Sequence, residues 1–238
     1  MKNYILIIIL FAGLISSAWS ISIFDIQYTA FPGNDNTYPS PYVGKSVSTE
    51  GIVTAVDYKS DGFFISEPIS GPYSGLLVLD RRNNVRTGDR IHISGVVQES
   101  FGMTSLQNIT SLTILERNHP LPRPAILTTA QITHAVEAEA YESVYAKIQS
   151  LSSSNKKSSR NRLGVSDGTG LCNISLGSFG NMPLISSKSY SQFSSITGIV
   201  TFSFGEFSLN PISVSDIEIH EPVSVQNRSW GKIKSIYK

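Results

Sequence analysis

Short runs of alternating apolar and polar residues, separated by turn-forming residues, follow one another through the first half of the chain. They lie at residues 43–58, 62–67, 75–80 and 89–98, with a last pair at 104–106 and 111–116. Runs rich in Val, Ile, Leu and Phe and bounded by Gly, Asp, Asn and Pro are typical of β-strands joined by tight turns. The long first run contains Gly51, where a strand can bend. This pattern predicts a small closed barrel of five strands.

The second half of the chain repeats positions of the first half at a constant spacing. Gly95 recurs 103 residues later as Gly198, and Leu106 recurs at the same offset as Leu209. The matching positions further include Val97 and Val200, Phe101 and Phe204, Gly102 and Gly205, Ile109 and Ile212, and Ile114 and Ile217. Upstream of these positions the match loosens, with offsets of about 95 to 100. Two copies with different loop lengths are therefore expected.

A proline-rich segment, Asn118-His-Pro-Leu-Pro-Arg-Pro, lies between the two copies. Three prolines in five residues forbid helix and favour an extended connector. Thr128 and Gln131 have the spacing of a capping box, so a short helix is expected over residues 130–140. We predict an all-β fold of two tandem five-stranded barrels, at residues 21–117 and 142–221, joined by a Pro-rich linker and a short helix at 118–141.

The first 20 residues have the features of a secretory signal peptide. Lys2 lies in a short positive segment, residues 4–15 are apolar, and residues 16–20 are mostly small. Cleavage is expected after Ser20, with a cut after Ala18 as a second frame, and an uncleaved anchor is the alternative. Since no later segment has the roughly 20 apolar residues that span a membrane, we expect a protein that is secreted or lies in the periplasm or at the cell surface.

Charge and cysteine content limit the chemistry of the chain. The net charge is +1, and removal of Lys2 leaves 18 Lys and Arg against 18 Asp and Glu, which excludes a strongly basic nucleic-acid binder. Residues 222–238 form a basic tail, with four Lys or Arg and no acid, that we expect to be mobile. Because Cys172 is the single cysteine, no intrachain disulfide can form. Its alternating surroundings predict a buried strand position.

No pattern of catalytic or metal-binding residues stands out. The four histidines, His92, His119, His134 and His220, belong to no HExxH, HxE or paired-His spacing, and no nucleophile elbow, Walker loop or dinucleotide fingerprint is present. Acids near residues 57–67 could hold a cation, but acids beside a turn usually serve the turn itself. The sequence therefore predicts no enzyme, no metal and no cofactor.

A set of short motifs carries a resemblance to a known family. They are Glu50-Gly-Ile-Val, Gly62-Phe-Phe-Ile, Gly88-Asp-Arg-Ile-His-Ile-Ser-Gly, Val97-Gln-Glu, Gly102-Met-Thr-Ser-Leu, Leu121-Pro and Tyr141-Glu-Ser-Val. Over residues 45–150 this series resembles the OB-fold domains that accompany secreted bacterial endonucleases and exonucleases. The resemblance weakens in the second copy, where Gln192-Phe-Ser replaces the Gly-Asp pair. It implies an OB-fold and a nucleic-acid-related role. Because the family's separate catalytic domain has no counterpart here, we expect no nuclease activity.

OB-folds bind oligonucleotides or oligosaccharides on the face of strands 2 and 3 and on the loops that join strands 1–2 and 4–5. In the first copy these loops offer Tyr58 and Phe101 for stacking on bases, but neighbouring acids oppose a phosphate backbone. The second copy carries a loop with four cations and no acid, followed by aromatic residues near its strand 4–5 hairpin. The candidate residues are Lys156, Lys157, Arg160, Arg162, Phe202 and Phe204. A solvated, serine-rich loop and phenylalanines that fill the barrel or an interdomain contact are the alternatives.

Three functional hypotheses follow for a non-catalytic exported protein. The first is weak binding of single-stranded nucleic acid through the second barrel. The second is an extracellular module that binds a glycan or another protein, which suits a neutral, serine-rich surface. The third is an accessory role for a separately encoded extracellular nuclease. The sequence alone does not choose among them.

Overall fold

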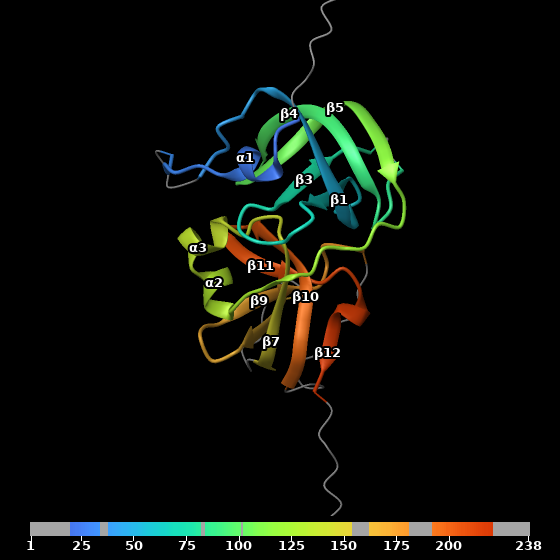
Figure 1. Cartoon of the computed structure of the whole chain (residues 1–238). Helices are drawn as coiled ribbons and strands as arrows, with labels where there is room; N and C mark the ends of the chain where they lie inside the picture. The colour runs from blue at the N-terminus through green and yellow to red at the C-terminus, as the bar shows by residue number, and fades with distance from the viewer. Residues whose placement is uncertain are drawn as a thin grey trace, which may run out of the picture.

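The computed structural model describes residues 20–33, 38–81, 84–100, 102–153, 162–180 and 192–220. Most of these residues lie in strands, and the strands form two barrels, one above the other in Figure 1. Both barrels have five strands, and the helices are few and short. The predicted all-β fold of two tandem OB-fold-like barrels is confirmed.

The first barrel closes in the strand order β1-β2-β3-β5-β4. Its strands are β1 (Ser46–Tyr58), β2 (Gly62–Ser66), β3 (Gly75–Leu79), β4 (Arg90–Ser100) and β5 (Met103–Glu116). β1 pairs with both β2 and β4, and β3 runs parallel to β5. The last pair of predicted runs is one strand, β5, because the chain stays paired with β4 past Asn108, which takes a left-handed conformation with φ of 48°.

Alternate residues of these strands point inward and form the core of the first barrel. Phe63 and Ile65 of β2 pack with Leu76 and Val78 of β3 in this core. The sequence pattern did not reveal α1 (Ile23–Gln27), a helix capped by the Ser22 side chain. This helix adds Ile23 and Ile26 to the same core.

The second barrel repeats the topology of the first. Its strands are β7 (Tyr145–Ser153), β8 (Arg162–Ser166), β9 (Cys172–Ser175), β10 (Gln192–Ser203) and β11 (Glu206–Asn210), and pairing of β10 with β7 closes the ring. β9 runs parallel to β11, as β3 does to β5. Two short strands extend this sheet, β6 (Ala125–Ile126) beside β7 and β12 (Ile217–Ile219) beside β10, the latter after the 3-10 turn η1 (Val214–Asp216). The repeat predicted from the offset of 103 residues thus corresponds to repeated strand pairing.

The predicted capping box is present, but the helix behind it is broken. Thr128 accepts a hydrogen bond from the backbone of Gln131, whose side chain accepts one from Thr128 N. Instead of one helix over 130–140, α2 (Thr129–Thr133) and α3 (Ala135–Glu139) meet at His134, whose backbone is extended. Thr133 Oγ1 donates to the carbonyl oxygens of Thr129 and Leu171, which ties the end of α2 to the second barrel.

The two barrels share an apolar interface. The outward-facing side chains Phe64 of β2 and Leu77 of β3 are buried against Phe179 and Ile199 of the second barrel. The interface is close enough that a Cβ at Gly75 would lie 2.0 Å from the Ser143 carbonyl oxygen. The strand 2–3 face, which binds ligands in many OB-folds, is therefore covered in the first barrel.

A buried carboxyl group lies beside this interface. Glu142 accepts a hydrogen bond from Thr104 N at 2.8 Å, and its other oxygen has no hydrogen-bond partner among the described residues. Burial raises the pKa of Glu142 well above its usual range, and the nearby Glu139 carboxyl adds a smaller increase. Burial and the Glu99 carboxylate raise the pKa of Glu139 to about 7. Both groups therefore favour the protonated form in the folded protein.

These raised pKa values predict that the protein loses stability as the pH rises. The pKa of a glutamate in the unfolded chain is about 4.3. When the pKa is higher in the folded protein, the group stabilises the fold fully below about pH 4.3, and this stabilisation is lost as the pH rises through the folded pKa. For Glu139 the stabilisation is lost between about pH 4.3 and 7. For Glu142, whose pKa is raised further, the loss extends to higher pH. Urea unfolding from about pH 5 to 9 measures it. The variant Glu142→Gln should show a flatter pH dependence, and parallel curves for variant and wild type would contradict this explanation.

The equivalent glycines of the two copies predict a second effect on stability. A Cβ would lie 2.7 Å from Gln107 O at Gly95 and 2.3 Å from Asn210 O at Gly198. We expect Gly95→Ala and Gly198→Ala each to lower the free energy of unfolding by about 1–3 kcal/mol, because backbone must move. Gly71→Ala is the matched control, since nothing lies within 4 Å of its Cβ. Equal urea midpoints for all three variants would contradict the close contact of Gly95 and Gly198 with the neighbouring backbone.

Candidate ligand-binding site between the barrels

A cleft of about 660 Å³ lies between the barrels and is lined by residues of both. We call it the junction cleft. The first barrel contributes Tyr58, Lys59, Asp61, Leu77, Leu79, Ser100 and Met103, and the second contributes Phe202, Ser203, Phe204 and Gly205. Three of the predicted site residues, Tyr58, Phe202 and Phe204, thus meet at one place although they belong to different copies.

Phe204 lies at the tip of the hairpin that joins β10 and β11. Phe204 and Gly205 both have positive φ, 56° and 79°, as the two central residues of a tight hairpin turn require. Asn or Asp is the usual residue at the first of these positions, and a large aromatic residue there is an uncommon, strained choice. The Phe204 side chain is 77% exposed. The turn thus holds a large and mostly exposed aromatic ring at the edge of the junction cleft.

Phe202 has a different surrounding from Phe204. Its ring centre is 4.9 Å from that of Phe207, which belongs to the core of the second barrel. On the other side, a Cβ at Gly102 would lie 2.7 Å from the Phe202 ring, so the hairpin between β4 and β5 of the first barrel packs on it. Phe202 therefore makes the interdomain contact that the sequence left as an alternative, and it also lines the cleft.

Tyr58 is not available to stack on a base, contrary to the prediction from the sequence. It is 3% exposed, and its ring centre lies 4.9 Å from that of Phe64 and 5.5 Å from that of Phe179. The reason is that the second barrel covers this end of β1. Lys59, which the sequence analysis did not single out, lies with its Nζ 5.0 Å from the Tyr58 ring centre and lines the cleft.

A second, more polar pocket of about 260 Å³ adjoins the junction cleft and shares Lys59 and Phe204 with it. Arg162 lines this pocket, but its Nη1 donates to Glu206 Oε2 at 2.6 Å and its side chain is 10% exposed. The predicted cation is thus compensated by an acid 44 positions away in the sequence. At the pocket wall, Asn210 Nδ2 donates to Thr201 Oγ1 at 2.9 Å. The pocket therefore combines hydroxyl and amide groups with a neutralised guanidinium.

The remaining predicted site residues, Lys156, Lys157, Arg160 and Phe101, lie outside the described residues. The segment with the three cations joins Ser153, the last residue of β7, to Arg162, the first of β8. Arg162, the first described residue after this segment, lines the polar pocket.

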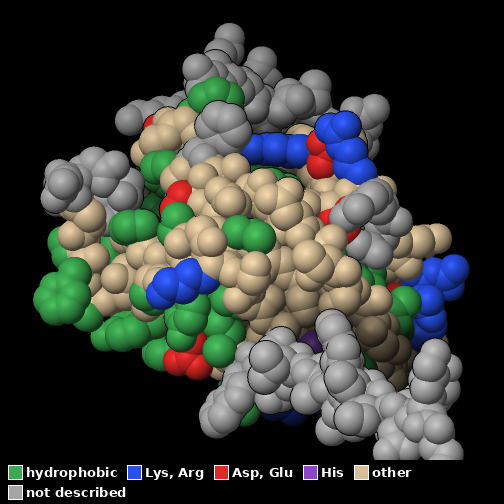
Figure 2. Space-filling model, turned by 90° about the horizontal axis from the view of Figure 1, so that it is seen from above, with side chains coloured by type: hydrophobic (Ala, Val, Ile, Leu, Met, Phe, Trp, Pro, Cys, Tyr) green, Lys and Arg blue, Asp and Glu red, His purple; other side chains and the backbone are tan. Residues whose placement is uncertain are grey.

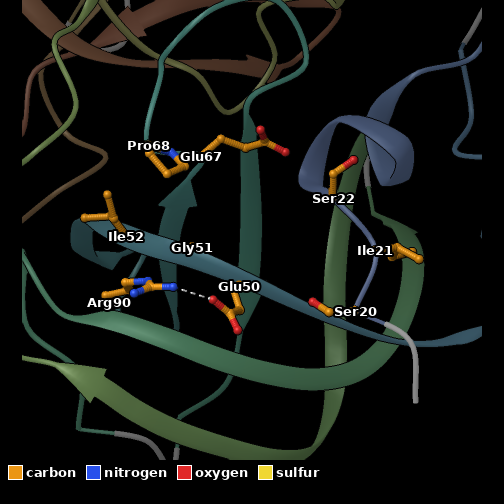
Figure 3. Close-up of a pocket in the computed structure, with 9 residues that line it drawn as sticks. All are labelled: Ser20, Ile21, Ser22, Glu50, Gly51, Ile52, Glu67, Pro68 and Arg90. Carbon is orange, nitrogen blue, oxygen red and sulfur yellow. Dashed lines mark hydrogen bonds and ion pairs between the residues drawn. The ribbon is translucent and has the colours of Figure 1, made fainter. Parts of the chain in front are cut away.

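Another hollow, of about 300 Å³, lies on the first barrel where the N-terminal segment joins it. Arg90 is paired with Glu50 at 2.9 Å. Figure 3 shows this pair on one side of the hollow and Ser20 and Ile21 on the other. Glu67 accepts a hydrogen bond from Phe24 N. The charged groups of this hollow therefore stabilise the fold, and Arg81 is likewise paired with an acid, Asp61.

Within the described parts of the chain, no group of three or more His, Cys, Asp or Glu side chains is arranged to hold a metal ion. Nor do these parts contain a helix with the length and apolar character needed to cross a bilayer.

No family model and no curated protein matches the chain. Among solved structures, a murine DNA-binding protein bound to double-stranded DNA matches with 11% identity over 70% of this chain and 93% of its own, at a TM-score of 0.32. The tetrameric p202 HIN2 has 12% identity over 75% and 97%, with a TM-score of 0.32, and the Ifi202 HINa domain in complex with 20bp dsDNA has 11% identity over 71% and 92%, with a TM-score of 0.30. A likeness at this level carries no argument about function.

The single cysteine provides a test of the second barrel's packing. Cys172 is buried in the core, and this burial raises the pKa of its thiol to about 12. Because the thiolate is the reactive form, we expect Cys172 in the native protein not to react with a disulfide reagent at mildly alkaline pH and to react at once in urea. Rapid reaction of the folded protein would contradict the described position of β9.

Proposed function

We propose that the protein is an exported, non-catalytic binding protein that holds a short segment of single-stranded nucleic acid in the junction cleft. The observation that carries this proposal is the exposed Phe204 ring, held by a strained turn beside Lys59 and a polar pocket. Aromatic rings that stack on bases and cations that follow phosphates are the two parts of a single-strand site.

The chemistry of the cleft assigns a role to each part. The Phe204 ring would stack on one base, and the apolar cleft wall would receive it. The hydroxyl and amide groups at Thr201 and Asn210 would meet polar atoms of the base or sugar. Lys59 would meet a phosphate, together with the three cations of the segment that ends at Arg162.

Charge compensation sets the expected strength of binding. Arg162 is paired with Glu206, and Arg81 with Asp61. The described residues of the two pockets leave few uncompensated cations to neutralise phosphates, and each cation contributes only about 0.7 to the slope of log affinity against log salt for single strands. Weak binding with a shallow salt dependence therefore follows.

The proposed export rests on the signal-like sequence of residues 1–20. Ile21 N donates to Ser48 O at 2.9 Å, and Ile23 is fully buried in the first barrel. Cleavage after Ser20 would leave this core intact, as the signal-like sequence requires. The destination would be the periplasm, the cell surface or the medium.

A glycan or a protein is the second candidate ligand, and one observation favours it. The polar pocket is lined by Ser, Thr and Asn side chains, and its arginine is already neutralised. Such a site suits an uncharged, hydroxyl-rich ligand. An accessory role beside a separately encoded extracellular nuclease remains what the family resemblance implies.

Fluorescence anisotropy of a labelled mixed-sequence single-stranded oligonucleotide tests the proposal with the chain 21–238. Loss of a stacked base costs about 1–3 kcal/mol, so Phe204→Ser should weaken binding at least about fivefold at low salt. Replacing Lys156, Lys157 and Arg160 by Ser should lower the salt slope by about 2. Phe31→Ser is the matched control, because this exposed phenylalanine lies outside the cleft.

Two results would contradict the proposal. Absence of binding at low salt would favour the glycan or protein ligand. Binding that survives Phe204→Ser and is lost only in the triple variant would place nucleic acid on the basic segment and not in the junction cleft.

A further inference from the structure

Three carboxyl groups meet where the two barrels join. Glu99 lies near the end of β4, Glu139 is the last residue of α3, and Glu142 follows three residues later. Figure 1 shows α3 at the level where the barrels meet. Burial raises the pKa of Glu142 most, and Glu139 and Glu99 raise it further, so the three groups lie close enough to repel one another as anions. We call Glu99, Glu139 and Glu142 the carboxyl cluster.

Hydrogen bonds at the carboxyl cluster connect the first barrel to the chain that leads into the second. Thr104, in β5, donates from its backbone N to Glu142 Oε1 at 2.8 Å and from its Oγ1 to Glu99 Oε1 at 2.7 Å. Tyr73 N, in the loop between β2 and β3, donates to Ala140 O at 2.5 Å. The end of α3 and the residues after it are therefore bonded to three segments of the first barrel.

The same part of the chain is also bonded to the second barrel. Ser143 N donates to Val200 O of β10 at 2.8 Å, and Val200 N donates to Val144 O at 3.1 Å. The Ser143 carbonyl oxygen in turn packs closely against Gly75 of β3. Residues 139–144, which we call the joint segment, thus lie between the barrels, and a displacement of this segment from the first barrel would separate the two.

The carboxyl cluster has no compensating cation among the described residues. No described Lys, Arg or His side chain forms an ion pair with any of its three members. Ser40 N donates to Glu99 Oε1, but Lys45 of the same segment donates from its Nζ to Pro41 O. The other titratable side chains that interact around Glu139 are the tyrosines Tyr28, Tyr38, Tyr73 and Tyr141. None of these neighbours carries a positive charge.

Burial makes negative charge at the cluster costly. Glu142 is 3% exposed, and its Oε2 has no hydrogen-bond partner among the described residues. A buried carboxylate beside other carboxyl groups loses hydration and is repelled by its neighbours. The outer face of the first barrel differs, since Figure 2 shows Lys and Arg side chains beside Asp and Glu there. The closed joint therefore favours a protonated cluster.

We propose that the carboxyl cluster is a pH-sensitive latch, which holds the joint segment on the first barrel when protonated and releases it when ionised, while each barrel stays folded. Release brings Glu139 and Glu142 into water and so relieves the repulsion between them. It also uncovers the outer face of β2–β3, where Phe64 and Leu77 are buried in the closed form. The latch is independent of any ligand of the junction cleft.

The latch opens as the pH rises. The pKa of Glu139 is about 7 in the closed form, whereas that of a solvated glutamate is about 4.3. Between these two values the open form gains about tenfold on the closed form for each pH unit. Glu142, whose pKa is also raised, extends the gain to higher pH. The joint should therefore be closed at about pH 5.5 and open more often at about pH 8.

Amide hydrogen exchange of the chain 21–238, resolved by residue with NMR, measures the opening. Two reporter amides are bonded across the joint, Tyr73 N to Ala140 O and Lys59 N to Ser178 O at 3.0 Å. At about pH 8 both should exchange about tenfold or more slowly in Glu139→Gln than in the unaltered chain, because glutamine cannot ionise. At about pH 5.5 the two proteins should exchange alike. Comparison at one pH removes the pH dependence of the exchange chemistry itself.

Two further variants keep the test decisive. Glu142→Gln should slow the same two amides, and Glu139→Gln, at a half-buried position, gives the result independently if the fully buried site does not accept an amide. Glu137→Gln is the matched control, since Glu137 is an exposed acid of α3 outside the cluster, and it should exchange like the unaltered chain.

Two results would overturn the proposal. The first is equal exchange of the reporter amides in the unaltered chain and both cluster variants at about pH 8. The second is an equal rise, in the unaltered chain, at the amides that pair β1 with β4 and β7 with β10. Ionisation would then unfold the barrels and not open the joint between them.

Discussion

The apolar contact between the outer face of β2–β3 and the second barrel determines what the rest of the molecule can do. Phe64 and Leu77 point away from the core of their own barrel and are buried by residues of the other. Burying one such side chain contributes about 1.5–3 kcal/mol, so this contact stabilises the packing of the two barrels against each other. The outer face of β2–β3 is therefore covered, and the junction cleft runs along the edge of this interface.

The two copies have diverged on their surfaces while keeping their strand pairing. The strands that correspond to β2 and β3 in the second barrel are β8 and β9, and their outward positions carry Gly164, Asn173 and Ser175 instead of large apolar groups. Asn173 and Ser175 are half-buried on this face, and Ser175 lines the pocket beside Phe204. The outer face of β2–β3 is thus apolar and buried in the interface, whereas the corresponding face of β8–β9 carries polar side chains.

Local and repeated patterns of the sequence predicted much of the fold. Alternation located the strands, the constant offset located the second copy, and Thr128 with Gln131 located the cap of α2. The site was predicted less well, because its features depend on contacts between distant segments. Tyr58 is buried by Phe179, and the charge of Arg162 is compensated by Glu206, neither of which a local window of sequence can show. Phe204 was identified because its position in the repeat places it at a hairpin tip.

The most direct test of the account is photo-crosslinking of a single-stranded oligonucleotide that contains a photoreactive pyrimidine, followed by mass-spectrometric mapping of the attached peptides. The account predicts attachment at Phe204 together with a residue of the first barrel that lines the junction cleft, such as Lys59 or Met103. Attachment confined to the second barrel, or to the first barrel away from the cleft, would show that the ligand does not lie between the two barrels and would contradict the account.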